Sequence, residues 1–177
     1  GRGLWLFDGE GWKNIAKPGS VPLAQVDRSV SCYDSKRDRV LLFPNSGKGV
    51  GPITVYSFRS GEVGKVKALN PQLVPKLTGP QAVYVPHCDR VLALWTIKDS
   101  AGRPCHPLYD CGENRWSLVY LGPHSVSKGR TAGVQGRGRG IVYDEARKLI
   151  YVITEAGGLF ALRLEPKASE PPQPTAK

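Results

Sequence analysis

Four segments of this sequence resemble one another and recur at nearly constant spacing. Each segment holds an alternating apolar run, and in three of the four the run enters a turn that contains glycine. The segments are residues 4–12, 54–61, 107–116 and 159–163. Aligned on Phe7, Phe58, Tyr109 and Leu162, they are separated by intervals of 51, 51 and 53 residues. A chain with such a fixed period is expected to build one structural unit several times over.

A second element recurs at a similar spacing and alternates with the first. It consists of a tyrosine, a polar turn and a strongly apolar run, and it occupies residues 33–43, 84–95 and 143–153. Each repeat therefore holds two hairpins, which amounts to about four short strands. Four strands in a unit of this length are typical of one blade of a β-propeller, in which each blade is an antiparallel sheet.

The composition supports an all-β fold. The 177 residues include 21 Gly and 15 Pro, which are spread between short β-branched and aromatic runs, so long helices have almost nowhere to form. No apolar run approaches the roughly 18 residues that a membrane-spanning helix needs. We therefore expect a soluble chain with no membrane insertion.

The repeats divide the chain into units that leave a ring open at both ends. We expect blades at 1–166, namely a half blade at 4–16 and blades at 17–71, 72–122 and 123–166, and a Pro-rich disordered tail at 167–177. The sequence has no Met and begins inside a repeat, so we expect a processed product, a fragment or a product of tag removal. Because a propeller closes with about four to eight blades, we also expect a longer propeller or a multi-chain assembly.

Apolar strands and aromatic side chains are expected to hold the blades together. Nearly all residues are apolar at 40–43 and 149–153, so we expect neighbouring blades to cover both faces of these strands. Trp12 and Trp116 each follow a turn, where an aromatic side chain can wedge between blades and bury about 150–250 Å². The tyrosines of the second element are also expected to be structural, and they are Tyr33, Tyr84 and Tyr143.

The order of residues in these repeats resembles the kelch repeat. A tyrosine and an aspartate precede a basic turn and an apolar strand, as at 33–43, and an aromatic-aspartate turn and a tryptophan follow, as at 107–116. The resemblance covers about residues 4–166 and is to the divergent repeats of bacterial kelch-like and galactose-oxidase-like propellers. The family's glycine doublet is absent after Phe43, Trp95 and Ile153, so WD-repeat and quinoprotein-like propellers stay open. The resemblance implies a propeller fold and a binding role.

Four cysteines raise the question of a metal site or a disulfide. They are Cys32, Cys88, Cys105 and Cys111, with His87 beside the second and His106 beside the third. Structural zinc sites usually bring closely paired cysteines, whereas Cys105 and Cys111 lie further apart, on either side of a predicted strand. Buried or half-buried free thiols are the favoured interpretation, and a Cys105–Cys111 or other disulfide and a metal site stay open. The compartment is not determined, although free thiols favour the cytoplasm.

No residue pattern of a catalytic site stands out. The tyrosines, histidines and modified tyrosine of a galactose-oxidase-like copper centre are not matched, and His87, His106 and His124 lie in predicted turns. No Ser-His-Asp order, paired-carboxylate motif or nucleophile elbow is found. We therefore expect no enzyme, no catalytic residue, no metal and no cofactor. A galactose-oxidase-like or glycan-processing enzyme fragment remains an alternative.

Positive charge is the strongest indication of a partner class. The formal net charge is +10, the pI is about 9.6, and no acidic residue occurs between Glu113 and Asp144. The core of this acid-free stretch is the Gly-Arg segment 136–140. The candidate partner-binding residues in the stretch are Lys128, Arg130, Arg137 and Arg139. A flexible loop of this kind could hold phosphates by charge alone. The favoured interpretation is an inter-blade loop with solvated arginines.

The expected function is therefore a non-catalytic binding or scaffold module that contacts another protein through propeller loops. The expected partner is another protein chain or the remainder of the same propeller. A subunit that contacts nucleic-acid phosphates through the basic Gly-Arg loop is the first alternative, and the enzyme fragment is the second.

Overall fold

The computed structural model is all-β, as the composition predicts. It describes residues 5–7, 9–15, 30–43, 51–74, 81–121, 125–127, 130–132, 138–154 and 158–166. Within these ranges there is no α-helix, and the helical elements are the single 3-10 turns η2 (Pro71–Leu73) and η3 (Pro86–Cys88). None of the described helical elements could cross a membrane, since each is too short. The expected tail at 167–177 lies outside the described residues.

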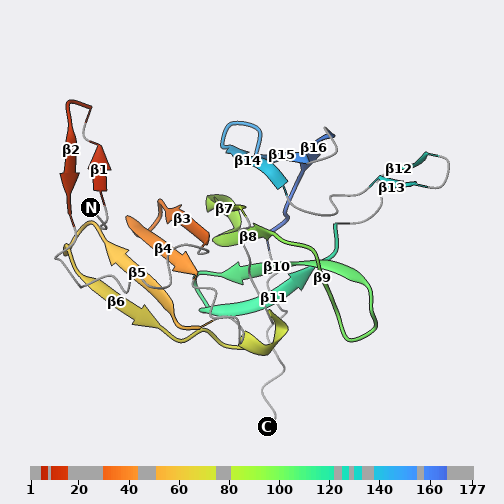
Figure 1. Cartoon of the computed structure of the whole chain (residues 1–177), viewed down its shortest axis with the longest axis horizontal. Coiled ribbons are helices and arrows are strands. Elements are labelled where there is room, and N and C mark those ends of the chain that lie inside the picture. The colour runs from red at the N-terminus through yellow and green to blue at the C-terminus, as the bar shows by residue number, and fades with distance from the viewer. Residues whose placement is uncertain are drawn as a thin grey trace, which may run out of the picture.

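Three antiparallel sheets follow one another along the chain (Figure 1). The first contains β3 (Val30–Asp34), β4 (Arg39–Phe43), β5 (Ile53–Ser57) and β6 (Val63–Val66), in that order. The second contains β7 (Gln81–Val85), β8 (Arg90–Leu94), β10 (Pro104–Asp110) and β11 (Arg115–Val119), and the short β9 (Ile97–Lys98) pairs with β10. The third contains β14 (Gly138–Asp144), β15 (Leu149–Thr154) and β16 (Leu159–Leu162).

Two hairpins stand apart from these sheets in the hydrogen-bonding pattern. One joins β1 (Trp5–Phe7) to β2 (Trp12–Asn14), and the other joins β12 (Ser125–Ser127) to β13 (Arg130–Ala132). The first sheet and the second are meanders of four strands in sequence, as the two hairpins per repeat predict, apart from the added β9. The third has three strands among the described residues, and no sheet closes on itself there.

Hairpins of the same design connect strands in all three sheets. In four of them a loop of four residues separates the last paired residues, for example Asp34 and Arg39. The fourth loop residue takes a left-handed backbone conformation with φ between 50° and 55° at Asp38, Asp89, Asn114 and Lys148. Asp and Asn tolerate this conformation better than other residues with a side chain. The polar turns therefore form where the sequence predicts them.

A tyrosine fastens three of these loops from the preceding strand. The hydroxyls of Tyr33, Tyr84 and Tyr109 donate to the side chain five residues later, at Asp38, Asp89 and Asn114. In the third sheet the corresponding pair is Tyr143 and Lys148, and a lysine offers no acceptor. The repeated Tyr-x-x-x-x-Asp/Asn spacing thus places a hydroxyl donor opposite a side-chain acceptor, and this hydrogen bond closes the loop.

The core lies in two layers, one on each face of the second sheet. Successive side chains of β8 point to opposite faces, as in any strand, so Val91 and Ala93 pack towards the first sheet while Leu92 and Leu94 pack towards the third. All four are at most 1% exposed. The first strands of the three sheets, β3, β7 and β14, are neighbours in space, because β7 contacts both of the others.

Of the two strands expected to be covered on both faces, β4 and β15, neither is fully buried on both, whereas β8 is. In β4, Leu41 and Phe43 are buried towards the second sheet, while Val40 and Leu42 on the opposite face are half-buried. In β15, Val152 is buried and Ile153 is 49% exposed. The reason is position, since the first and third sheets each have a neighbouring described sheet on one side.

The expected blade aromatics occupy different environments. Trp116 is 1% exposed between the first and second sheets, with its ring 5.3 Å from that of Phe43 and 5.1 Å from that of Tyr109. Tyr84 is also buried there. Trp12, by contrast, is 68% exposed, so the expectation that it wedges between blades is wrong. The remaining two expected aromatics, Tyr33 and Tyr143, lie on the faces described next.

Candidate partner interface at the hairpin loops

A buried aspartate organises the loop between β3 and β4. The Asp34 side chain is 0% exposed, and its Oδ2 accepts from Arg39 Nε at 2.8 Å and from Arg37 Nη1 at 3.2 Å. Its Oδ1 accepts from the backbone N–H of Arg37 at 3.3 Å. A buried carboxylate needs such partners because its desolvation is otherwise costly. These contacts hold Arg37 over the loop, with its guanidinium directed towards the second sheet.

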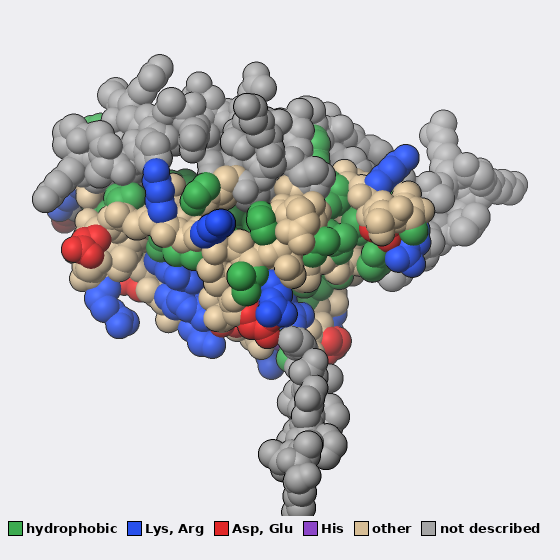
Figure 2. Space-filling view, turned by 90° about the horizontal axis from the view of Figure 1, so that it is seen from below, with side chains coloured by type: hydrophobic (Ala, Val, Ile, Leu, Met, Phe, Trp, Pro, Cys, Tyr) green, Lys and Arg blue, Asp and Glu red, His purple; other side chains and the backbone are tan. Residues whose placement is uncertain are grey.

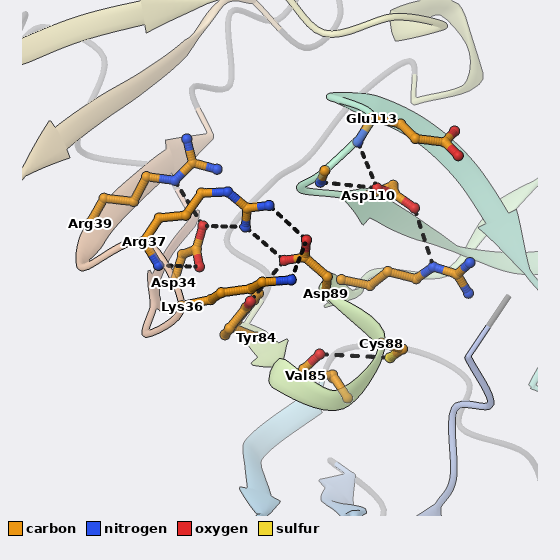
Figure 3. A network of polar contacts seen from close by, with 12 residues as sticks. Asp34, Lys36, Arg37, Arg39, Tyr84, Val85, Cys88, Asp89, Asp110 and Glu113 are labelled. Atoms are coloured by element: carbon orange, nitrogen blue, oxygen red, sulfur yellow. Dashed lines mark hydrogen bonds and ion pairs between the residues drawn. The ribbon is translucent and has the colours of Figure 1, made fainter.

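That guanidinium joins the first sheet to the second (Figure 3). Arg37 donates from Nη1 and Nη2 to the two carboxylate oxygens of Asp89 at 2.7 and 2.6 Å, across 52 residues of sequence. Tyr84 donates to the same carboxylate at 2.8 Å, and Lys36 Nζ lies 3.5 Å from it. The Arg37 guanidinium, aided by the Tyr84 hydroxyl, lowers the pKa of Asp89 to about 2. We call this arrangement the arginine clasp.

The loop after β10 packs closely against the arginine clasp. The backbone N–H of Cys111 donates to the carbonyl of Asp89 at 3.0 Å. A Cβ on Gly112 would lie 3.2 Å from Asp89 Oδ2, tighter than ordinary contact, so glycine permits this approach. Asp110 stabilises the loop by accepting from the N–H groups of Gly112 and Glu113, and it lies 3.6 Å from Arg90 Nε.

A histidine in η3, the turn between β7 and β8, joins the second sheet to the third. His87 Nδ1 lies 2.7 Å from the Tyr143 hydroxyl, and its Nε2 lies 2.8 Å from the carbonyl oxygen of Leu164. Since a carbonyl can only accept, Nε2 donates, and in the neutral ring Nδ1 accepts from the tyrosine. The two rings also stack, with centroids 5.7 Å apart and planes 18° apart. We call this the histidine clasp.

The outward face of the first sheet carries an acceptor that resembles the one in the arginine clasp. Tyr33 donates to Asp38 at 2.8 Å, as Tyr84 does to Asp89, but no described cation contacts Asp38. The pair borders an open pocket of about 440 Å³ that is also lined by Val40 and Phe58. We call this the Asp38 pocket. Tyr33 is 49% exposed on it.

The outward face of the third sheet carries an arginine in the same local setting as Arg37. Arg147 donates from its backbone N–H to Asp144 Oδ1 at 3.0 Å and from Nη1 to Asp144 Oδ2 at 2.8 Å. The side chain is 69% exposed. The same sheet exposes large apolar side chains, and these are Val142 (59%), Ile153 (49%) and Leu159 (69%).

The hairpin β1–β2 repeats an aromatic pair that is buried elsewhere. Phe7 and Trp12 are cross-strand partners with rings 5.2 Å apart, as Tyr109 and Trp116 are at 5.1 Å. Both rings of the hairpin are more than half exposed, and Trp5 is 45% exposed. A two-stranded hairpin is marginally stable alone, and its aromatic face is exposed in this structure.

The predicted basic residues fall largely where the structure gives no side-chain geometry. Lys128 and Arg137 lie outside the described residues, and of Arg130 and Arg139 only the strands are described, β13 and β14. The expectation of a loop throughout 136–140 is wrong for its second half, because β14 begins at Gly138. The register shifts between Gly138 and Gly140, which leaves Arg139 in a bulge.

The cysteines are free thiols in this structure. Cys105 and Cys111 are buried at the two ends of the extended strand β10, too far apart for a disulfide, so that alternative is wrong. Burial raises the pKa of the Cys111 thiol to about 12 and also raises that of Cys105. Among the described residues no three or more His, Cys, Asp or Glu groups gather as a metal site would require.

The two described histidines lie in different settings. His87 lies in the turn η3, as predicted, but His106 is 3% exposed within β10 and not in a turn. His124 lies outside the described residues. No model of a known protein family matches this sequence, and no curated protein matches it either. The kelch resemblance therefore depends on the residues of this chain alone.

Proposed function

We propose that the chain is a non-catalytic binding module built from kelch-like β-propeller blades. The three sheets act as successive blades, with β3, β7 and β14 as the inner strands that approach one another. Packing of consecutive sheets face to face, with a core on each side of the second sheet, supports this assignment. The interval of 51 residues between Tyr33 and Tyr84 also supports it.

The observation that carries the binding role is the outward face of the third sheet. Val142, Ile153 and Leu159 are each about half exposed or more on it, and Arg147 is exposed in the β14–β15 loop at one end of the sheet. A contiguous apolar patch with a polar rim is a common mark of a protein-binding surface. Its partner is another protein chain that presents an apolar surface and an acceptor for the arginine.

A matched pair of leucine substitutions tests this role. Tagged wild-type chain is used to capture proteins from an extract of its source cells, in parallel with Leu159→Asp and the control Leu69→Asp. Leu69 is 52% exposed but lies away from the third sheet, between β6 and η2. We expect the same proteins with wild type and Leu69→Asp and their loss with Leu159→Asp. If Leu159→Asp retains them, or wild type captures nothing specific, the binding role assigned to this face is wrong.

The charge favours one further candidate, a nucleic-acid-contacting subunit. The net charge is +10, and Figure 2 shows Lys and Arg side chains gathered on the described part of one face. Such a surface gives binding that weakens steeply with salt. The test is retention of RNA and DNA over a salt series, with Arg137→Ala and Arg139→Ala together as the variant. Loss of both charges should reduce the slope of log affinity against log salt by up to about two, whereas no retention at low salt excludes this candidate.

A further inference from the structure

The arginine clasp shows how consecutive sheets of this chain recognise one another. The donor is Arg37, held by Asp34 three residues earlier in the first sheet. The acceptor is the carboxylate of Asp89 in the second sheet, which Tyr84 orients from five residues earlier. Two parallel N–H···O contacts between guanidinium and carboxylate make the pairing geometrically specific.

The acceptor half of the clasp occurs a second time, at the Asp38 pocket. Tyr33 and Asp38 precede Tyr84 and Asp89 by 51 residues each, and both hydroxyl–carboxylate contacts measure 2.8 Å. Asp38 and Asp89 also share the left-handed backbone, with φ of 50° and 55°. The pocket of about 440 Å³ is far larger than the roughly 30 Å³ share of one liquid water. It can therefore admit a guanidinium, as the corresponding site on the second sheet does.

The donor half also occurs a second time, on the outward face of the third sheet. Asp144 and Arg147 follow Asp34 and Arg37 by 110 residues each, and both arginines make the same two contacts to their aspartate. The exposed fraction differs, at 29% for Arg37 and 69% for Arg147. The difference arises because Arg37 has a second carboxylate to bind, whereas among the described residues Arg147 has Asp144 alone.

The apolar surfaces beside the two halves also match the internal pattern. Ile153 corresponds in register to Phe43, which is 1% exposed against the second sheet, yet Ile153 is 49% exposed. On the acceptor side, Val40 corresponds to the fully buried Val91 and borders the Asp38 pocket. Each outward face thus has residues that match those of a sheet-to-sheet contact. On the first sheet this face is partly covered, because the hydroxyl of Tyr56, the cross-strand partner of Val40, donates to the carbonyl of Ile15 at 3.3 Å.

The two halves belong to opposite ends of the row of sheets. The second sheet packs between the first and the third, so Arg147 faces away from the Asp38 pocket of its own chain. We propose that a second copy of this chain supplies the missing contact, with its Arg147 seated between Asp38 and Tyr33 of the first copy. The copies then associate head to tail, which is a heterologous interface. This proposal names the partner of the binding role proposed above and rests on it.

Charge reversal at each half tests the association. Arg147→Glu removes the donor, and Asp38→Lys removes the acceptor with a residue that the loop tolerates, since Lys148 adopts φ of 54° in the third sheet. Lys65→Glu and Glu62→Lys are the controls, because each makes the same change in net charge at an exposed position of the first sheet. Mass is measured by sedimentation over a range of concentrations, and folding is checked by circular dichroism.

We expect wild type and both controls to associate as concentration rises, and each test variant to associate at least about tenfold more weakly. An equimolar mixture of Arg147→Glu and Asp38→Lys should regain association, because glutamate of one copy then meets lysine of the other. A wild-type monomer throughout, or a mixture that stays dissociated, overturns the proposal. If capture from extract still depends on Leu159 while wild type is monomeric, the binding role stands and the second copy is not the partner.

Discussion

Residues of the same type differ in their contacts and burial in this chain, depending on whether another sheet packs against them. Asp38 and Asp89 share a backbone conformation and a tyrosine donor, but among the described residues only Asp89 contacts an arginine. Trp12 and Trp116 likewise each pair across strands with an aromatic residue, but in the described part of the chain only Trp116 packs against another sheet. The chemical role of each side chain is therefore set by the neighbouring sheet, and the two pairs give matched comparisons.

The first comparison concerns acid. Because the arginine clasp depresses the pKa of Asp89 from 3.8 to about 2, the stability it contributes is fully present above the ordinary carboxyl value and is lost as pH falls towards the folded value. Asp89→Asn should lower the free energy of unfolding at neutral pH, and this difference from wild type should shrink between about pH 5 and pH 2. Urea unfolding at several pH values measures it, with Glu62→Gln, an exposed position, as control. A difference independent of pH would contradict the ion pair.

The second comparison concerns the tryptophans. Trp116→Ala should lower the free energy of unfolding by about 3–5 kcal/mol, the range for a buried aromatic, whereas Trp12→Ala should change it by less than about 0.5 kcal/mol. Trp116→Phe should cost less than Trp116→Ala, because no described acceptor binds the buried Nε1. Chemical denaturation measures all three variants. Equal losses at both tryptophans would mean that the exposed hairpin face is covered in solution.

Among the elements, the four-residue hairpin loop is the unit that the sequence specifies most directly. Asp34, Asp110 and Asp144 each accept from a loop N–H, and a residue with positive φ ends each loop. The third sheet departs from this design by placing Lys148 at the left-handed position. A lysine there has the backbone strain without the side-chain acceptor that Asp or Asn offers.

Replacing this lysine should therefore stabilise the third sheet. Lys148→Asn should raise the free energy of unfolding by up to about 1 kcal/mol, since Asn adopts the left-handed region more readily. Glu145→Asn is the control, because Glu145 is exposed in the same loop but does not have positive φ. Thermal unfolding of the two variants decides the matter. A loss of stability in Lys148→Asn would show that the lysine makes a contact that outweighs the strain.

For the whole molecule, local patterns predicted more than contacts between sheets did. The alternating runs and the polar turns predicted strands and loops, because both depend on neighbours within a few residues. The contact between Arg37 and Asp89 was not predicted, because the two residues lie 52 positions apart in the sequence. The basic residues at 128–139 were the predicted binding residues instead. The signal was present in the recurrence of Asp-x-x-Arg at 34–37 and 144–147. Trp12 is exposed and Trp116 is buried because only the latter packs between two described sheets. The residue type does not predict which sheets have such a neighbour.

The arginine clasp and the histidine clasp differ in chemistry, so we expect each contact between sheets to be disrupted independently of the other. The histidine clasp holds the third sheet through one imidazole that contacts Tyr143 and Leu164, while the arginine clasp holds the first sheet through charge. His87→Ala should therefore speed amide exchange in β14–β16 and leave β3–β6 unchanged, because local opening is governed by the contacts that are lost. Arg37→Ala is the matched variant and should affect the first sheet instead. Hydrogen exchange followed by mass spectrometry resolves the sheets. Equal acceleration in all three with His87→Ala would show that they open as one cooperative unit.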